Sequence, residues 1–219
     1  KVKALRENFR KYLTTEQKEV NFITPEQEAY YVIKGTTLPK YRAISSTVDI
    51  GSGNTKGGFL AGENLDQIKS ISFDFGTRTF SNKIETEIRE LMVGYDSVAR
   101  YLSTNYIEPQ IDDQFKKVEG LKTRTVVHLV GGVTWAMVSY MYPHYSDQNF
   151  VPISPAVVKK FRHEIMENYS ILIRPNIDAI TDDELRHKAR VNIARATKEF
   201  SREELIAGSI ILDEICTEY

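Results

Sequence analysis

Apolar side chains recur along this chain with two different periods, and the change of period separates predicted helices from predicted strands. A spacing of three or four residues predicts helices over residues 1–12 and 25–34. The second helix has a complete start signal in Thr24-Pro25-Glu26-Gln27, which supplies an N-cap threonine, a proline at the first helical position and an early acid. The short apolar run at residues 20–23 predicts a strand between the two helices.

The next part of the chain is β-like and is interrupted by turns. Strands are predicted over residues 41–50, 57–60 and 68–75, and the last of these alternates on a roughly two-residue period. Residues 82–102 then return to helical spacing, with a break expected at Gly94.

The second half of the chain contains one more strand and is otherwise helical. Residues 124–130 form an apolar run that barely alternates, which predicts a strand covered on both faces. Helices are predicted over residues 133–141, 152–169 and 181–219. This order predicts an α/β fold, a mixed sheet flanked by helices and followed by a helical C-terminal part.

Composition excludes several classes of protein. The 219 residues are 41% apolar, which is enough for one sizeable core or two small ones. Lys and Arg total 29 against 30 Asp and Glu, so the net charge of -1 provides no general basic field for nucleic acid. The most apolar stretch, residues 126–142, is interrupted by His128 and a glycine pair, which favours a buried strand and helix over a membrane span. The single cysteine, Cys216, excludes an internal disulfide and, with no signal sequence visible, favours the cytoplasm.

The most informative window is the glycine-rich segment from Val48 to Gly58, which lies between two predicted strands. That context predicts a tight hairpin and not the strand-to-helix junction of a Rossmann or Walker loop. Glycines let backbone amides face a ligand, and such a cluster of amides can bind an anion, with side-chain donors added by Ser52, Asn54 and Thr55. The alternative is a hairpin whose glycines permit a positive φ, with Asp49 capping its own turn.

A second glycine turn, Gly131-Gly132, ends the strand at 124–130 and begins the following helix. Free amides at a helix N-terminus attract a phosphate or a nucleotide. Close packing of the strand against the helix explains the same two glycines equally well.

These features resemble a known enzyme family. Asp49 to Thr55, Asp-Ile-Gly-Ser-Gly-Asn-Thr, resembles the Asp-Ile-Gly-Gly-Gly-Ser-Thr phosphate loop that begins the second domain of the exopolyphosphatase and guanosine pentaphosphate phosphohydrolase (Ppx/GppA) family. In that family a helix about twenty residues earlier carries Glu-Glu-Ala, with the catalytic glutamate immediately before the alanine. Here Glu26-Gln27-Glu28-Ala29 matches that sequence, and Glu28 lies 21 positions before Asp49.

Further segments resemble the family in the same order, so that the resemblance spans nearly the whole chain. They are residues 72–80, 130–134 and 200–212. The match covers the second half of the family's length. We therefore expect residues 1–38 to be a remnant of the first domain and residues 39–219 to be a second, ribonuclease H-like domain of the actin-like ATPase superfamily, with a helical tail.

The resemblance implies a metal-assisted hydrolysis of a terminal phosphoryl group, with polyphosphate or a guanosine polyphosphate as the partner. It implies Mg²⁺ held by Asp49, and Glu28 as the general base or the positioner of the attacking water. The turn from Gly51 to Thr55 would hold the transferring phosphoryl group. A second phosphate contact would come from Gly131, Gly132 and Thr134. No nucleic-acid or membrane partner is expected, and the oligomeric state is open, with a homodimer among the options.

Lys56 is the main departure from the family pattern, in which the loop ends in a glutamate. The exchange removes a candidate ligand of metal or water, and a lysine there would bind phosphate as a point charge. One alternative is therefore a non-catalytic phosphate- or nucleotide-binding domain of the same fold. Another is a ParM-like plasmid-partition actin, whose Asp-Ile-Gly-x-Gly-Asn-Thr-Lys loop matches residues 54–56 better but stands at the start of its chain, whereas 48 residues precede Asp49 here.

Overall fold

A four-stranded mixed sheet forms the centre of the fold. The computed structural model describes residues 2–10, 12 and 21–219. β1 pairs antiparallel with β2, β2 pairs antiparallel with β3, and β1 pairs parallel with β4, which gives the order β3-β2-β1-β4. The strands are β1 (Ser45–Ile50), β2 (Thr55–Ala61), β3 (Gln67–Phe73) and β4 (Val126–Val130). The predicted α/β arrangement of a mixed sheet with flanking helices is confirmed.

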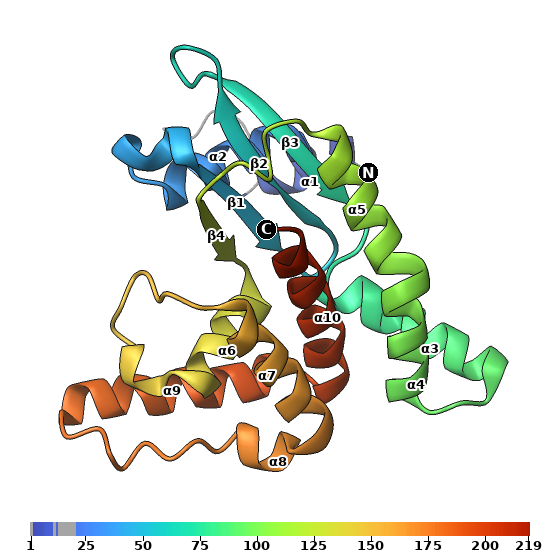
Figure 1. The fold of residues 1–219 in the computed structure, drawn as a ribbon, viewed down its shortest axis with the longest axis vertical. Helices are drawn as coiled ribbons and strands as arrows, with labels where there is room; N and C mark the ends of the chain where they lie inside the picture. The colour runs from blue at the N-terminus through green and yellow to red at the C-terminus, as the bar shows by residue number, and fades with distance from the viewer. Residues whose placement is uncertain (1, 11, 13–20) are drawn as a thin grey trace.

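Helices surround this sheet and make up most of the second half of the chain (Figure 1). Their bounds are α1 (Val2–Arg10), α2 (Pro25–Thr36), η1 (Pro39–Ile44), α3 (Thr77–Leu91), α4 (Tyr95–Leu102), η2 (Ser103–Ile107), α5 (Glu108–Lys117), α6 (Gly132–Met141), η3 (Pro143–Tyr145), α7 (Pro155–Glu167), α8 (Tyr169–Leu172), α9 (Asp183–Glu199) and α10 (Arg202–Glu218). Across the described ranges, each helix is either too short or too polar to span a bilayer.

The two faces of the sheet differ because successive side chains of a strand point to opposite sides. One face carries the buried apolar residues of the main core, Val48, Ile50, Phe59, Ile71 and Phe73. The other face is more polar, and α2 packs against it through contacts with β1, β2 and β3. The candidate site lies on this second, polar face.

α10 is the central helix of the molecule. Every residue from Leu205 to Leu212 is buried, and the helix contacts β1, α3, α6 and α7. Figure 1 shows it running between the side formed by α3 to α5 and the side formed by α6 to α9. Its first residue, Arg202, forms a two-pronged ion pair with Asp96 at 3.0 and 3.3 Å and donates to the carbonyls of Ile165 and Met166. Such planar pairing fixes the direction in which the helix starts.

Most of the predicted helices are confirmed. α2 begins at Pro25, where Thr24 and Gln27 form a reciprocal capping box. The long helix predicted over 82–102 is interrupted before Gly94, as expected, because Met92 ends α3 in the left-handed region with φ 57°. α3 begins at Thr77, five residues earlier than predicted, because the turn between β1 and β2 supplies hydrogen-bond acceptors for its first amides.

Three strand predictions are wrong in part. Residues 39–44 form the 3₁₀ helix η1, which Pro39 begins, so the strand starts at Ser45 and not at Tyr41. No strand forms over residues 21–24, whose side chains are exposed, and residue 20 lies outside the described residues. β4 is an edge strand and its five residues are only half-buried, so it is not covered on both faces.

Candidate functional site

The turn between β1 and β2 is a tight hairpin, as the sequence predicts. The Gly51 amide donates to the Asn54 carbonyl at 3.0 Å, and the strands pair immediately behind it. A Cβ at Gly51 would approach that carbonyl oxygen to 2.9 Å, which explains the glycine at this position. Neither Gly51 nor Gly53 has a positive φ, so the explanation by a positive φ is wrong for these two, whereas Gly58 of the same segment has φ 138°. A Cβ at Gly53 would meet no atom within 4 Å, so no packing contact requires a glycine there.

The start of α3 fixes the direction of the peptide groups in this turn. The Gly51 carbonyl accepts a hydrogen bond from the Thr77 amide at 2.9 Å. The Ser52 carbonyl accepts from the next two amides of the helix at 2.9 and 3.1 Å, and the Gly53 carbonyl accepts from the Thr79 hydroxyl at 3.0 Å. Three consecutive carbonyls of the turn therefore point toward α3.

The amides of the same peptide groups point the other way. In a planar trans peptide the N–H lies opposite the carbonyl, and the chain has no cis bonds. The N–H groups of Ser52, Gly53 and Asn54 therefore point away from α3, and none of them donates to another residue within the described ranges. Ser52 and Gly53 are exposed. Three adjacent outward amides make a cluster of donors that suits an anion such as phosphate.

Lys56 occupies the polar face beside this turn and connects both predicted catalytic carboxylates. Its Nζ lies 3.0 Å from Glu28 Oε1 and 3.2 Å from Asp49 Oδ2, and it donates to Asn54 Oδ1 at 3.5 Å. Asp49 and Lys56 are direct cross-strand partners, which sets the second distance. Glu28 and Asp49, the two residues to which the resemblance gives catalytic roles, are brought together at one ammonium group.

The three charged side chains differ strongly in exposure. The Lys56 side chain is 6% exposed, Asp49 is 19% exposed and Glu28 is 45% exposed. Burial alone lowers the pKa of Lys56, but its hydrogen bond to Glu28 and the charge of Asp49 outweigh burial and raise that pKa above the ordinary lysine value. Lys56 is therefore charged at neutral pH, and it faces the carboxylates instead of reaching outward as a free point charge.

α2 positions Glu28 over the sheet. The capping box starts the helix at Pro25, which places Glu28 in its first turn and Ala29 and Ile33 on its buried face. Because those apolar residues hold the helix against the sheet, Glu28 is held at the edge of the contact, where one carboxylate oxygen meets Lys56.

The second glycine turn lies directly beside the first. β4 runs parallel to β1 with Val130 opposite Asp49, so the carboxyl ends of both strands meet at one edge of the sheet. Gly131 has φ 107°, and a Cβ there would overlap the Ile50 carbonyl oxygen, so both backbone conformation and close packing require glycine. The first three amides of α6 donate to no residue in the described part of the chain. The two candidate phosphate turns are thus brought together, as ligand sites of open α/β sheets commonly are.

α10 connects the two helices whose N-termini meet the turns, a role that sequence reasoning missed. A Cβ at Gly208 would lie 2.7 Å from Thr77 Cγ2 and 2.7 Å from Val133 Cγ2. Thr77 begins α3 and Val133 lies in the first turn of α6. A glycine in the middle of a predicted apolar helix is the signal that could have indicated this close approach.

Two hydroxyl groups predicted to contact phosphate do not face an open site. Thr55 is fully buried among the partners Ile50 and Phe73, and its hydroxyl has no hydrogen-bond partner among the described residues. Strand alternation explains this, because Thr55 points to the face opposite Lys56. The Thr134 hydroxyl turns back to the Val130 carbonyl at 3.5 Å. The amides of the turns, and not these hydroxyls, are the donors available to a ligand.

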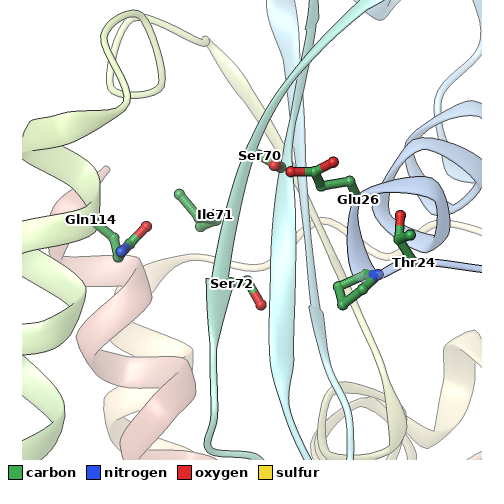
Figure 2. A pocket seen from close by; sticks show the side chains of 7 residues that line it. Thr24, Glu26, Ser70, Ile71, Ser72 and Gln114 are labelled. Atoms are coloured by element: carbon green, nitrogen blue, oxygen red, sulfur yellow. The ribbon is translucent and has the colours of Figure 1, made fainter.

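A separate cavity of about 520 Å³ opens beside the edge strand β3 (Figure 2). It is lined by Thr24, Pro25, Glu26, Ser70, Ile71, Ser72 and Gln114. Figure 2 shows these side chains on both sides of β3, between α2 and α5. None of the predicted site residues lines the cavity, although Ser72 is the β3 partner of Lys56. We therefore place the candidate site at the two turns and not in this cavity.

Comparison with solved structures gives the fold a name. An exopolyphosphatase-like protein superposes with a TM-score of 0.61 at 14% identity, over 97% of this chain. The Aquifex aeolicus member of the Ppx/GppA family gives a TM-score of 0.53 at 18% identity, again over 97% of this chain. This chain has the Ppx/GppA fold. The Aquifex aeolicus PPX-GPPA enzyme adds a TM-score of 0.51 at 18% identity over 95% of the chain.

This chain covers less than two thirds of the length of the solved structures that it matches. The chain spans 62%, 61% and 62% of those three proteins. No protein-family model matches the sequence, and no curated protein matches it. The similarity therefore shows the fold alone.

Proposed function

We propose that this chain is the second-domain half of a Ppx/GppA-type phosphoanhydride hydrolase and that its two glycine turns bind the terminal phosphate of polyphosphate or a guanosine polyphosphate. The observation that carries this proposal is the row of outward amides at Ser52, Gly53 and Asn54. Amides held in place by a helix need no reorganisation when an anion binds, so they can stabilise charge on a transferring phosphoryl group.

In this proposal the active site lies between two domains, and the chain supplies one side of it. In this proposal residues 39–219 form a ribonuclease H-like domain, and residues 1–38 belong to the preceding domain, whose other residues complete the site. α2 lies against the sheet of the larger part, so Glu28 reaches the turns from the proposed domain boundary.

Glu28 is the residue best placed to act on water. One of its oxygens is held by Lys56, while Oε2 has no hydrogen bond within the described residues and the side chain is 45% exposed. We propose that Oε2 accepts a proton from a water whose oxygen bonds to the terminal phosphorus. The bridging P–O bond breaks with its electron pair on the leaving oxygen, and a proton later returns to the products, which are orthophosphate and a shortened chain.

The test is phosphate release by the full-length gene product from polyphosphate and from pppGpp. Glu28→Gln removes the proposed base, and Glu26→Gln changes a neighbouring exposed acid of the same helix turn as the matched control. We expect Glu28→Gln to reduce turnover by about 10²-fold or more, the usual contribution of a general base, and Glu26→Gln to leave it unchanged. Equal turnover in wild type and Glu28→Gln would remove Glu28 from the mechanism.

The paired carboxylates also favour a second candidate function, a non-catalytic phosphate- or nucleotide-binding domain. Lys56 pairs with the carboxylates of Glu28 and Asp49, and this pairing weakens them as proton acceptors for a hydrolase. This candidate predicts that triphosphate raises the melting temperature while no variant or wild type releases phosphate above background. A ParM-like actin gains no comparable support, since the solved structures that match over nearly the whole chain carry Ppx/GppA or exopolyphosphatase names.

A further inference from the structure

The ammonium group of Lys56 is surrounded, at ion-pair and hydrogen-bond distances, by oxygens of the kind that also bind metal ions. Three oxygens from three segments converge on Nζ, namely Glu28 Oε1 at 3.0 Å, Asp49 Oδ2 at 3.2 Å and Asn54 Oδ1 at 3.5 Å. Carboxylate and amide oxygens are the donors that Mg²⁺ and similar hard cations take. The cation that they surround here is part of the protein.

A divalent cation does not fit beside this arrangement. Mg²⁺ binds oxygen at about 2.1 Å, and Nζ lies 3.2 Å from Asp49 Oδ2, so an ion on that oxygen would lie no more than about 5.3 Å from Nζ. Two cations at that separation repel each other strongly in a region where the Lys56 side chain is 6% exposed. Across the described ranges no group of three or more His, Cys, Asp or Glu side chains converges to offset that repulsion. The Mg²⁺ expected from the resemblance is therefore not supported by the residues present.

The site keeps the same net charge when a lysine at position 56 replaces the glutamate and divalent cation of the resembling loop. Glu28, Asp49 and Lys56 together carry a net charge of about -1 when all three are ionised. The resembling loop has a glutamate at the position of Lys56, and a glutamate plus a divalent cation contributes the same single positive charge as one lysine. We propose that Lys56 replaces the divalent cation of this half-site, and that the turn at residues 51–54 binds phosphate without a metal ion.

Phosphate binding without a metal ion rests on the proposed phosphate-binding function, whereas the exclusion of a metal ion by Lys56 does not. In this arrangement the outward amides of residues 52–54 hold the anion. Lys56 cancels one of the two carboxylate charges that would otherwise repel it.

Metal binding is tested with Mn²⁺, whose free-ion electron paramagnetic resonance signal falls when it binds. Wild type, Lys56→Glu and the matched control Lys69→Glu, an exposed lysine of β3, are titrated separately. We expect Lys56→Glu to bind one Mn²⁺ per chain at least ten times more tightly than either of the others, and Asp49→Asn in that background to remove the binding. Wild type that binds Mn²⁺ as tightly as Lys56→Glu, or Lys56→Glu that binds none, would overturn the inference. If circular dichroism shows that Lys56→Glu is unfolded, Lys56→Gln replaces it with the same expected order.

Phosphate binding is measured separately by calorimetry with inorganic triphosphate, once in EDTA and once in Mg²⁺. We expect the wild-type dissociation constants in the two conditions to agree within about twofold once the triphosphate bound to Mg²⁺ in solution is accounted for. Binding that requires Mg²⁺ would overturn the inference. Absence of binding in both conditions would refute the proposed phosphate function and the metal-free binding that rests on it, while the Mn²⁺ titration still decides whether Lys56 excludes a metal.

Discussion

Replacing Lys56 by methionine removes the buried charge while keeping a side chain of similar length. Removing one partner of a buried ion pair usually costs about 3–5 kcal/mol, because the other charge is left uncompensated. Glu28 is 45% exposed and can be solvated by water, whereas Asp49 is 19% exposed and cannot be fully solvated. We therefore expect a loss of about 2–3 kcal/mol in the free energy of unfolding. For a chain of this size that corresponds to a fall in melting temperature of about 4–12 °C.

A double-mutant cycle separates the two carboxylates. Urea unfolding is followed by the fluorescence of the single tryptophan, Trp135, in wild type, Lys56→Met, Asp49→Asn and the double variant. We expect a coupling of about 1–2 kcal/mol between Lys56 and Asp49, and a smaller one in the equivalent cycle with Glu28→Gln. Lys69→Met, at an exposed position of β3, is the control and should change stability by less than about 0.5 kcal/mol.

The pH dependence gives the same prediction an independent check. The pKa of Lys56 is raised in the folded state, so its stabilising contribution is complete below the unfolded lysine pKa of about 10.4 and is lost as the pH rises through the folded pKa. The stability difference between wild type and Lys56→Met should be constant from about pH 6 to about pH 9 and decrease only above pH ~10.4. A coupling energy to Asp49 that is indistinguishable from zero at pH 7 would refute the reasoning.

Three further predictions concern packing and thiol chemistry. Gly131→Ala forces a side chain onto a φ of 107° and into the Ile50 carbonyl, so we expect the free energy of unfolding in urea to fall by about 3 kcal/mol or more. Gly53→Ala, which has open space around it, should lower that free energy by less than about 1 kcal/mol. Gly208→Val overpacks the contact with α3 and α6, so it should lower the free energy of unfolding by about 1–3 kcal/mol and weaken triphosphate binding in calorimetry. Unchanged triphosphate affinity in a folded variant would contradict the proposed link between α10 and the turns. Burial raises the pKa of the Cys216 thiol to about 11, so a disulfide reagent at pH 8 should react about 100-fold faster in urea than with the native protein, and equal rates would contradict the buried position.

The parts of the fold that follow local rules could be predicted from the sequence. Thr24 with Pro25 marks the start of α2 because a cap and an N1 proline act within one helical turn. The position of the hairpin follows from glycines between two β-like runs. The proximity of Glu28 and Asp49 to one another also could be predicted, although only from the resemblance and its spacing.

The features that the sequence could not indicate depend on neighbours that are distant along the chain. Whether β4 lies in the middle or at the edge of the sheet depends on how many strands pair, and an apolar run does not encode that number. The early start of α3 depends on carbonyls of the hairpin 25 residues before it. The sequence singles out Lys56 as a departure from the resembling loop, but it does not indicate that Lys56 is buried beneath two acids, which follows from the strand register and the position of α2.

The contact of Gly208 with Thr77 and Val133 has a mechanical consequence for the two glycine turns. The first amides of α3 are hydrogen-bonded to the first turn, and α6 begins at the second turn. α10 touches both helices and is itself anchored through Arg202. A displacement of one turn is therefore transmitted through a rigid, close-packed helix to the other. Occupancy of either turn by an anion should slow amide hydrogen exchange at both, so the two halves of the site respond to a ligand as one unit.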